Sequence, residues 1–136
     1  MSCVLAFSPT TLDLDSYIHC RSVEKQIEVV MEWQPLIEKY FKSEDQIQAL
    51  RIIYCESRGK PTAVGINKDG SKDVGLWQFN DNTWYDWLVP KLKITSPRTN
   101  PIVATAVASW VVYKDTQNKY GNGWYHWNSS GHCWDD

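Results

Sequence analysis

The sequence predicts an α+β fold that is mainly helical and carries a small antiparallel β-hairpin lobe. Three observations support this class: an apolar helical run follows Ser43, a hairpin-like segment spans residues 63–79, and Asn100-Pro101 begins another long helix. With 136 residues, the chain is long enough for one core and too short for two domains of ordinary size.

The first 42 residues are predicted to form an N-terminal extension that precedes the main domain. Residues 1–21 show no clear periodicity and are expected to be irregular. From Ser22 to about Gln34 apolar residues recur at helical spacing, and Pro35 separates this helix from a second short one. We interpret residues 1–42 as scaffold or docking helices, and residues 43–136 as one compact unit.

Ser43-Glu44-Asp45-Gln46 has the pattern of a capping box and predicts a helix that runs to about Ser57. The helix is apolar nearly all round, so it should be buried, and Glu56 lies on the same face as Ile52 and Ile53. Burial and the negative end of the helix dipole would both raise the pKa of Glu56. The alternative is a solvent-exposed Glu56 that pairs with Arg58 or Lys60.

The hairpin is predicted from Val64 and Ile66, a turn at residues 68–70, and a return strand through Asp73. Gly75 then permits a close backbone approach. Asp73 has polar neighbours and is expected to stay ionised, whereas Glu56 is expected to be protonated more readily. Two carboxyl groups with separated pKa values are what acid catalysis on a glycosidic bond requires. The alternative is that Asp73 is a solvated strand residue.

Beyond the hairpin, Asp81 or Asn82 is expected to cap a short helix that Pro90 helps to end. The helix that begins at Asn100-Pro101 should reach about Tyr113. The tail, residues 121–136, is predicted to be loop-like. It is rich in aromatic residues, which can serve both as core and as stacking surfaces for sugars.

Composition excludes several classes of function. The net charge of −2 argues against binding to nucleic acid, which requires a basic face. No apolar run approaches the roughly 20 residues of a membrane span. The first residues do not have the pattern of a signal peptide, so we expect a protein that is made in a cytoplasm and delivered by other means.

The four cysteines, at positions 3, 20, 55 and 133, match no zinc motif, and we expect neither a metal nor a cofactor. Four cysteines allow three pairings. A bridge between Cys55 and Cys133 would join the tail to the helix that carries Glu56. The alternative, which the sequence supports equally well, is that all four cysteines are reduced.

Glu56-Ser57, followed after seventeen positions by Asp73, lies in a longer motif: Asn67-x-Asp69-Gly70-Ser71-x-Asp73-x-Gly75-Leu76-x-Gln78-x-Asn80. This block resembles the lysozyme superfamily, and animal-type lysozymes in particular. Cys55-Glu56-Ser57, the Asn100 helix and the Trp-rich tail are similar to phage and bacterial lytic transglycosylase domains. The resemblance is strong over residues 43–84, weaker over residues 100–134, and absent before residue 43.

The resemblance implies a lysozyme-like fold with an active-site cleft between a helical lobe and the hairpin lobe. It implies that the protein is a muramidase that cleaves the β-1,4 bond between N-acetylmuramic acid and N-acetylglucosamine in peptidoglycan, with Glu56 as the general acid and Asp73 as the second carboxylate. Residues expected to bind substrate are Asn67, Ser71, Gln78, Asn80, Trp84, Tyr125 and Trp127.

Two alternatives stay open. Lytic transglycosylases rely on one glutamate and an internal attack that leaves a 1,6-anhydro sugar, so Asp73 favours hydrolysis. A non-catalytic glycan-binding or structural module would also keep the fold. The chain ends and the four cysteines suggest a bacteriophage enzyme, either an endolysin or a virion component docked on phage structural proteins through residues 1–42.

Overall fold

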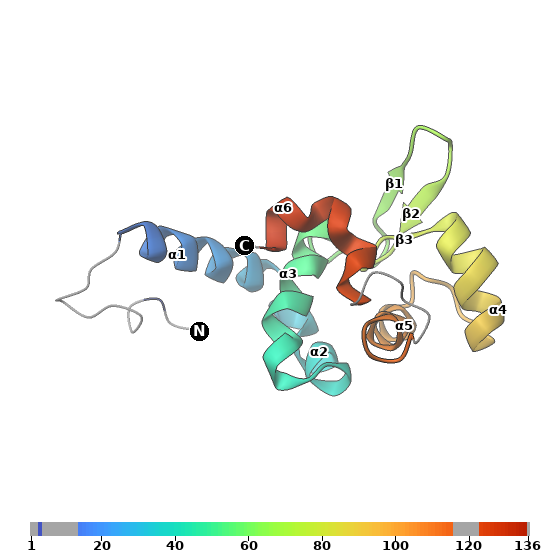
Figure 1. Ribbon diagram of the computed structural model, residues 1–136, viewed down its shortest axis with the longest axis horizontal. Helices are drawn as coiled ribbons and strands as arrows, with labels where there is room; N and C mark the ends of the chain where they lie inside the picture. The colour runs from blue at the N-terminus through green and yellow to red at the C-terminus, as the bar shows by residue number, and fades with distance from the viewer. Residues whose placement is uncertain (1–2, 4–13, 116–122, 136) are drawn as a thin grey trace.

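A buried helix, α3 (Gln46–Ser57), lies at the centre of the molecule, and the other elements surround it (Figure 1). In the computed structural model, the structure describes residue 3, residues 14–115 and residues 123–135. Ala49, Ile52 and Ile53 have no exposed surface, as the apolar pattern of this helix predicts. The described elements form the expected mainly helical α+β architecture.

The capping box predicted at the start of this helix is not formed. Ser43–Asp45 forms a separate 3₁₀ turn, and neither this turn nor α3 has a side-chain cap. The Gln46 side chain instead donates to the carbonyl oxygen of Phe41, 3.1 Å away. The predicted helix is correct, but the chain enters it through a tighter turn that leaves the Ser43 hydroxyl out of the cap.

The N-terminal extension is more helical than expected. Helix α1 (Leu14–Val29) begins eight positions before the predicted start at Ser22, and only Val23 in it is buried. A helix this exposed buries no regular stripe, which explains why its first half shows no periodicity in the sequence. The 3₁₀ turn η2 (Met31–Trp33) and helix α2 (Gln34–Tyr40) follow, with Pro35 in the first turn of α2.

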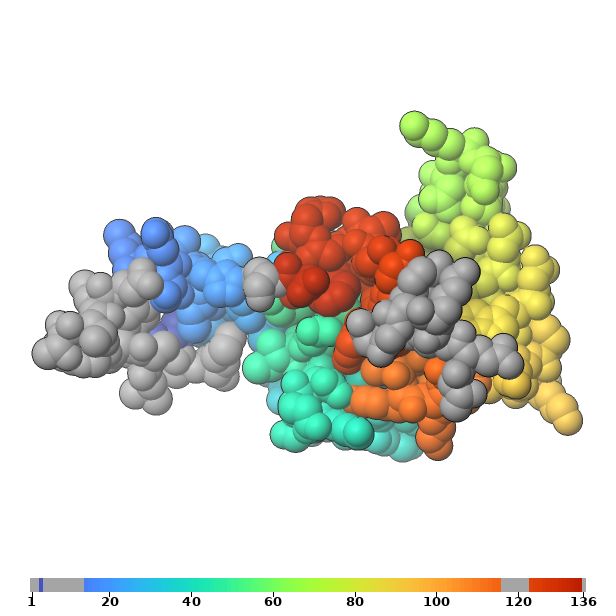
Figure 2. Space-filling view, viewed as in Figure 1, coloured from blue at the N-terminus to red at the C-terminus, as the bar shows by residue number. Residues whose placement is uncertain are grey.

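Three short strands form an antiparallel sheet in the order β1-β2-β3. Strand β1 (Val64–Ile66) and β2 (Lys72–Val74) are the predicted hairpin, and β3 (Phe79–Asn80) adds to β2. The hairpin stands away from the helical body, with a notch between it and the C-terminal segment (Figures 1 and 2). Asp73 is paired with Gly65 on one side and Asn80 on the other.

The next helix passes through Pro90 and does not end there. A π-helical segment, η4 (Thr83–Leu88), continues directly into α4 (Val89–Leu92), where Pro90 occupies the first turn. Pro90 has no N–H to donate and lies two residues after the π-helical segment, and the helix runs on until Lys93 adopts a left-handed conformation.

Helix α5 (Pro101–Tyr113) begins as predicted. The Asn100 side chain accepts hydrogen bonds from the backbone N–H groups of Ile102 and Val103. The tail was predicted to be loop-like, which is wrong for its described part. It forms the 3₁₀ segment η5 (Gly123–Ser130) and helix α6 (Gly131–Trp134), held by the burial of Trp127 and Trp134.

One hydrophobic core joins these elements, and it includes residues from both sides of position 42. Val30, Ile37 and Phe41 pack in the same cluster as Trp77 and Trp127. Helix α2 is therefore part of the main domain. A docking role for the extension stays a prediction, and its residues 1–2 and 4–13 lie outside the described part. No helix among the described residues is both long and apolar enough to cross a membrane.

Candidate active site

A cleft lies between the end of α3, the sheet, η4 and the tail. Five of the predicted site residues line it: Glu56, Asp73, Gln78, Asn80 and Trp127. The structure thus brings together the two carboxyl groups that the sequence places seventeen positions apart. Six further residues complete the lining: Phe79, Thr83, Trp87, Val111, His126 and Ser129.

Glu56 is held in the cleft because the end of its helix is hydrogen-bonded to the segment between β2 and β3. The hydroxyl of the buried Ser57 lies 2.8 Å from the carbonyl oxygen of Leu76 and 3.1 Å from that of Ile53. The hydroxyl oxygen of Ser57 also accepts a hydrogen bond from the N–H of Gly59. The serine of the Glu-Ser pair therefore fixes where α3 ends, and with it the position of Glu56.

The Glu56 side chain accepts a hydrogen bond from Ser130, with 2.8 Å between Ser130 Oγ and Glu56 Oε1. The alternative partner considered from the sequence, Arg58, donates instead to the carbonyl oxygen of Tyr54 and lies over the Tyr54 ring. Burial raises the pKa of Glu56, the Ser130 hydrogen bond lowers it, and the negative charge of Asp73 raises it further. The net direction is upward, which favours the protonated acid.

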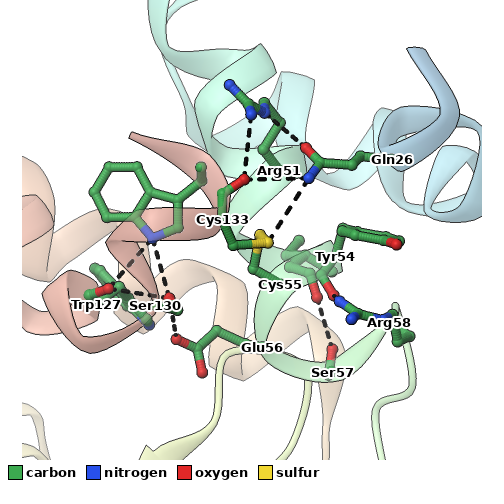
Figure 3. The surroundings of a disulfide bond; sticks show 12 residues. Gln26, Arg51, Tyr54, Cys55, Glu56, Ser57, Arg58, Trp127, Ser130 and Cys133 are labelled. Carbon is green, nitrogen blue, oxygen red and sulfur yellow. Dashed lines mark hydrogen bonds between the residues drawn. A yellow bond between two sulfur atoms is a disulfide. The ribbon is translucent and has the colours of Figure 1, made fainter. Parts of the chain in front are cut away.

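A disulfide joins Cys55 to Cys133, and a second joins Cys3 to Cys20. The choice that the sequence left open is thus resolved in favour of the bridge between the tail and the helix of Glu56. Figure 3 shows its surroundings: the side chains of Gln26 and Arg51 both donate to the carbonyl oxygen of Cys133. Covalent and polar contacts therefore attach the tail to α3 one residue before Glu56.

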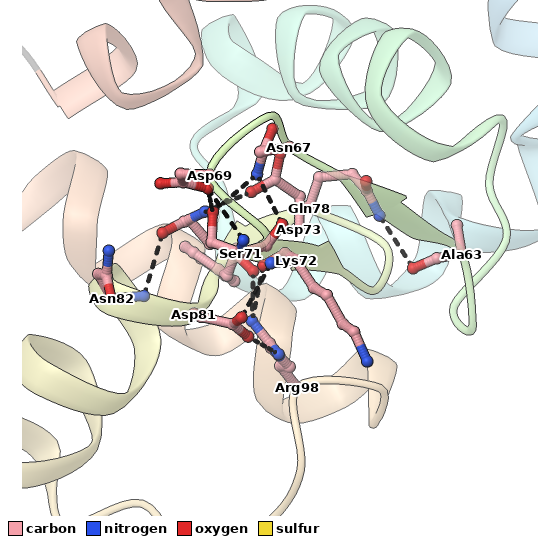
Figure 4. Close-up of polar contacts among 12 residues, drawn as sticks. Ala63, Asn67, Asp69, Ser71, Lys72, Asp73, Gln78, Asp81, Asn82 and Arg98 are labelled. Carbon is pink, nitrogen blue, oxygen red and sulfur yellow. Dashed lines mark hydrogen bonds and ion pairs between the residues drawn. The ribbon is translucent and has the colours of Figure 1, made fainter.

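Asp73 is oriented by Asn80 on the neighbouring strand. The Asn80 amide donates to Asp73 Oδ1 at 2.9 Å and to Ser71 Oγ at 3.0 Å. Its oxygen accepts from the backbone N–H of Asn82, at the start of the next helix. Ser71 was expected to form hydrogen bonds beside Asp73. Its hydroxyl oxygen accepts from the Asn80 amide, and its hydroxyl group donates to Asp69 (Figure 4). Asn80 thus links the second carboxylate to both the hairpin and η4.

Gln78 adopts a left-handed backbone conformation, with φ of 52°, which is uncommon for a residue other than glycine. Its side-chain amide donates to the carbonyl oxygens of Ala63 and Gly75. These two bonds hold the strained residue at the edge of the cleft. Backbone strain of this kind is found at binding sites more often than elsewhere.

Four predicted substrate-binding residues lie outside the cleft lining. Two of them, Asn67 and Ser71, bond to each other within the hairpin turn. Trp84 is only 1% exposed and packs against Phe79, so it supports the cleft from the core and cannot stack on a sugar, which corrects the expectation. Tyr125 lies on a separate groove with Trp124 and Asn128.

The sequence analysis did not identify two features of the tail side of the cleft. Trp87 and His126 stack on each other, with ring centroids 5.3 Å apart, and both line the cleft. Burial lowers the pKa of His126, and nearby Asp115 acts in the opposite direction. Ser130, which bonds Glu56, was also missed. No local pattern identifies these residues, since their partners are distant in sequence.

Among the described residues, the cluster that could share a metal ion lies away from the cleft. In the part of the chain that the structure describes, one cluster of donor residues is close enough to share an ion: Cys3, Cys20 and Glu24. Two of these three residues are joined in a disulfide, so the cluster does not fit a metal.

The chain is similar to curated proteins and to one family model. The chain is 32% identical over 89 residues to the invasion protein IagB of Salmonella typhimurium and to that of Salmonella typhi. The match covers 64% of this chain and 53% of the relatives, so the chain spans about half the length of the curated relatives it matches. No solved structure matches it significantly. The family model described as the transglycosylase SLT domain matches residues 37–130, which include the whole cleft, and the chain therefore belongs to the transglycosylase SLT domain family.

Proposed function

We propose that this protein is a peptidoglycan lytic transglycosylase that cleaves the β-1,4 bond between N-acetylmuramic acid and N-acetylglucosamine. The observation that carries the proposal is the placement of Glu56, a carboxyl group with a raised pKa, in a cleft that also contains Asp73. Membership of the transglycosylase SLT domain family supports the anhydro-forming reaction over hydrolysis.

In the proposed first step, protonated Glu56 donates its proton to the glycosidic oxygen. The bond from this oxygen to C1 of the N-acetylmuramic acid breaks, and N-acetylglucosamine leaves with a new hydroxyl group. Positive charge develops at C1 and the ring oxygen, as in other glycosidases. The Asp73 carboxylate lines the same cleft and is oriented by Asn80, so it stabilises this charge.

In the second step, Glu56 is a carboxylate and acts as a base. It removes the proton from the 6-hydroxyl group of the same N-acetylmuramic acid, whose oxygen then forms a bond to C1. The product is a 1,6-anhydro sugar, no water is consumed, and Glu56 is protonated again. Ser130 is already within hydrogen-bond distance of Glu56 and is suited to the charged state between the two steps.

Lysozyme-type hydrolysis, the reaction predicted from the sequence, is the second candidate. Asp73 is the observation that favours it, since a second carboxylate can act as the nucleophile or stabilise the cation long enough for water to attack. In that case water replaces the 6-hydroxyl group, and the product has a reducing end. Gln78 and Asn80 line the cleft, and we expect them to bind the sugar in both reactions.

The products released from purified peptidoglycan, analysed by mass spectrometry, distinguish these candidates. Wild type, Glu56→Gln and Asp73→Asn are compared, and Glu44→Gln, which changes an exposed glutamate remote from the cleft, is the control. We expect 1,6-anhydro products from wild type and the control, and none from Glu56→Gln. Reducing-end products would assign hydrolysis instead.

The Asp73→Asn variant tests the second carboxylate separately. We expect about a tenfold or larger loss of rate if Asp73 stabilises the transition state, because one oriented charge or donor typically contributes that much. A folded wild type that releases nothing from several wall types would overturn both enzymatic candidates. The non-catalytic glycan-binding module would then take their place.

The proposed substrate also bears on where the protein acts. Two relatives are named invasion proteins of Salmonella. We propose that the protein acts at the wall. Delivery through a phage particle, with residues 1–42 docked on structural proteins, remains a prediction. Fractionation of the producing cells, followed by detection of the protein in the wall fraction, tests this location.

A further inference from the structure

The hydroxyl group of Ser130 lies at the centre of a small hydrogen-bond network behind Glu56. Its oxygen is 2.8 Å from Glu56 Oε1 and 3.0 Å from the carbonyl oxygen of Trp127. The indole N–H of Trp134 donates to the same oxygen at 3.0 Å. Trp134 and Trp127 are both buried, so the network is shielded from solvent on the side away from the cleft.

The donor and acceptor types in this network limit the ways it can be arranged. An indole N–H only donates, so Trp134 occupies one lone pair of Ser130 Oγ. A backbone carbonyl only accepts, so Trp127 can receive the single proton of the Ser130 hydroxyl but cannot supply one. Glu56 Oε1 can also accept that proton, in either state of the acid, because a neutral carboxyl group keeps one oxygen without a proton.

Ser130 can therefore serve both states of the acid in the same position. With Glu56 ionised, the Ser130 hydroxyl donates to Glu56 Oε1. With Glu56 protonated on its other oxygen, Oε2, that proton can reach the glycosidic oxygen while Oε1 still accepts from Ser130. The two states differ only by the proton on Oε2.

We propose that Ser130 is the positioning residue of Glu56 and holds its carboxyl group in one place in both protonation states of the reaction. The inference rests on the proposed function, in which Glu56 gives up a proton in one step and recovers it in the next. An acid that shifted on losing its proton would have to be realigned before it could act as a base, and misalignment costs rate.

The tail is anchored well enough to perform this task. Ser130 is three positions before Cys133, which is bonded to Cys55 next to Glu56 (Figure 3). Gln26 and Arg51 hold the carbonyl group of Cys133. Glu56 is part of α3, and the tail that carries Ser130 is fixed to α3 by the disulfide and by the bonds to Cys133. These contacts keep the two side chains at hydrogen-bond distance, 2.8 Å.

The electrostatic surroundings are consistent with this role. Ser130 lowers the pKa of Glu56, in opposition to burial and to Asp73. The elements packed around Glu56 carry other ionisable side chains: Arg51 and Tyr54 of α3, Arg58 directly after it, Lys72 and Asp73 of β2, Tyr125 and His126 of η5, and His132 of α6. Removal of the Ser130 hydroxyl should therefore raise the pKa of Glu56 while these groups stay in place.

The test combines kinetics with a direct titration of Glu56. We compare wild type, Ser130→Ala, Ser130→Thr, and Ser22→Ala as a control on the exposed surface of α1. For Ser130→Ala we expect kcat to fall about tenfold or more, with KM little changed, because a hydrogen bond to a charged group is lost. The alkaline limb of the pH profile should move to higher pH. Ser130→Thr keeps the hydroxyl and should restore both values.

Carbon-13 NMR of the Glu56 side-chain carboxyl measures the same shift without activity. A higher Glu56 pKa in Ser130→Ala than in wild type supports the proposal even if the enzyme fails to cleave peptidoglycan, a result that would sink the proposed function alone. An unchanged Glu56 pKa together with an unchanged pH profile would overturn the role of Ser130. If Ser130→Ala does not fold, Ser130→Val against Ser130→Thr makes the same comparison between side chains of equal shape.

Discussion

Gly75 lies directly against Arg98: a Cβ atom on Gly75 would be 2.4 Å from the carbonyl oxygen of Arg98. Gly75 follows β2, two positions after Asp73, and has a φ of 92°. On the opposite side of this contact, the Arg98 side chain donates to the carbonyl oxygen of Phe79 and pairs with Asp81 (Figure 4). The sheet that carries Asp73 is therefore packed against the backbone of Arg98 at Gly75, where there is no room for a Cβ atom.

Substitution of Gly75 should destabilise the protein more than substitution of a glycine with similar backbone geometry. Gly75→Ala and Gly70→Ala both place alanine at a positive φ, but nothing lies within 4 Å of a Cβ at position 70. We expect Gly70→Ala to cost about 1 kcal/mol from backbone strain alone. Gly75→Ala should cost about 2 kcal/mol or more, because the backbone at Arg98 must also move. Urea denaturation measures both, and equal losses would argue against the close contact.

The disulfide between Cys55 and Cys133 should contribute more stability than the one between Cys3 and Cys20. The first closes a loop of 78 residues and the second a loop of 17. The chain-entropy model predicts losses of about 4 and about 3 kcal/mol when each bridge is removed. The double variants Cys55→Ser/Cys133→Ser and Cys3→Ser/Cys20→Ser leave no unpaired thiol. A larger loss of unfolding free energy for the shorter loop would contradict the prediction.

Replacement of the acid should make the protein less active and, at neutral pH, no less stable. Glu56 has a higher pKa in the folded state than its ordinary value of 4.5, so folding favours the protonated form. Its contribution to stability is therefore fully present below about pH 4.5 and is lost as the pH rises through the folded pKa. Glutamine does not ionise, so the Glu56→Gln variant does not lose this stability as the pH rises.

The melting temperature of Glu56→Gln relative to wild type should thus increase from pH 4 to about pH 8. Over the same range, Glu44→Gln should show no such trend. A melting-temperature difference for Glu56→Gln that is flat or falls with pH would show that folding does not raise the pKa of Glu56.

Asp81 should show the opposite dependence on pH. Its pKa is lowered, first by the hydrogen bond from Arg98 and then by the backbone N–H of Lys72. Its contribution to stability is therefore present above the unfolded value of about 3.8 and is lost as the pH falls through the folded pKa. Asp81→Asn should melt below wild type at pH 7, and the difference should close in acid. Asp86→Asn, on the exposed face of η4, is the control; a gap that persists in acid would indicate a packing defect instead.

Several elements could be predicted from the sequence because their signals are local. Asn100-Pro101 begins α5 through hydrogen bonds from Ile102 and Val103 to the Asn100 side chain, and the turn at residues 68–70 defines the hairpin. The apolar residues around Ile52 and Ile53 identify the buried helix of Glu56. Two other local signals were wrong. The Ser43 capping box is not formed, and Pro90 does not end its helix.

The sequence by itself determined the central helix, the hairpin and the spacing of the two carboxyl groups, since each depends on residues a few positions apart. Only the tertiary structure decided the pairing of the cysteines, the helical tail, the burial of Trp84 and the contact of Ser130 with Glu56. Ser130 and Glu56 are 74 positions apart, and they meet because Trp127 and Trp134 bury the tail against α3. That packing depends on the summed burial of side chains from the whole chain, which no local pattern records.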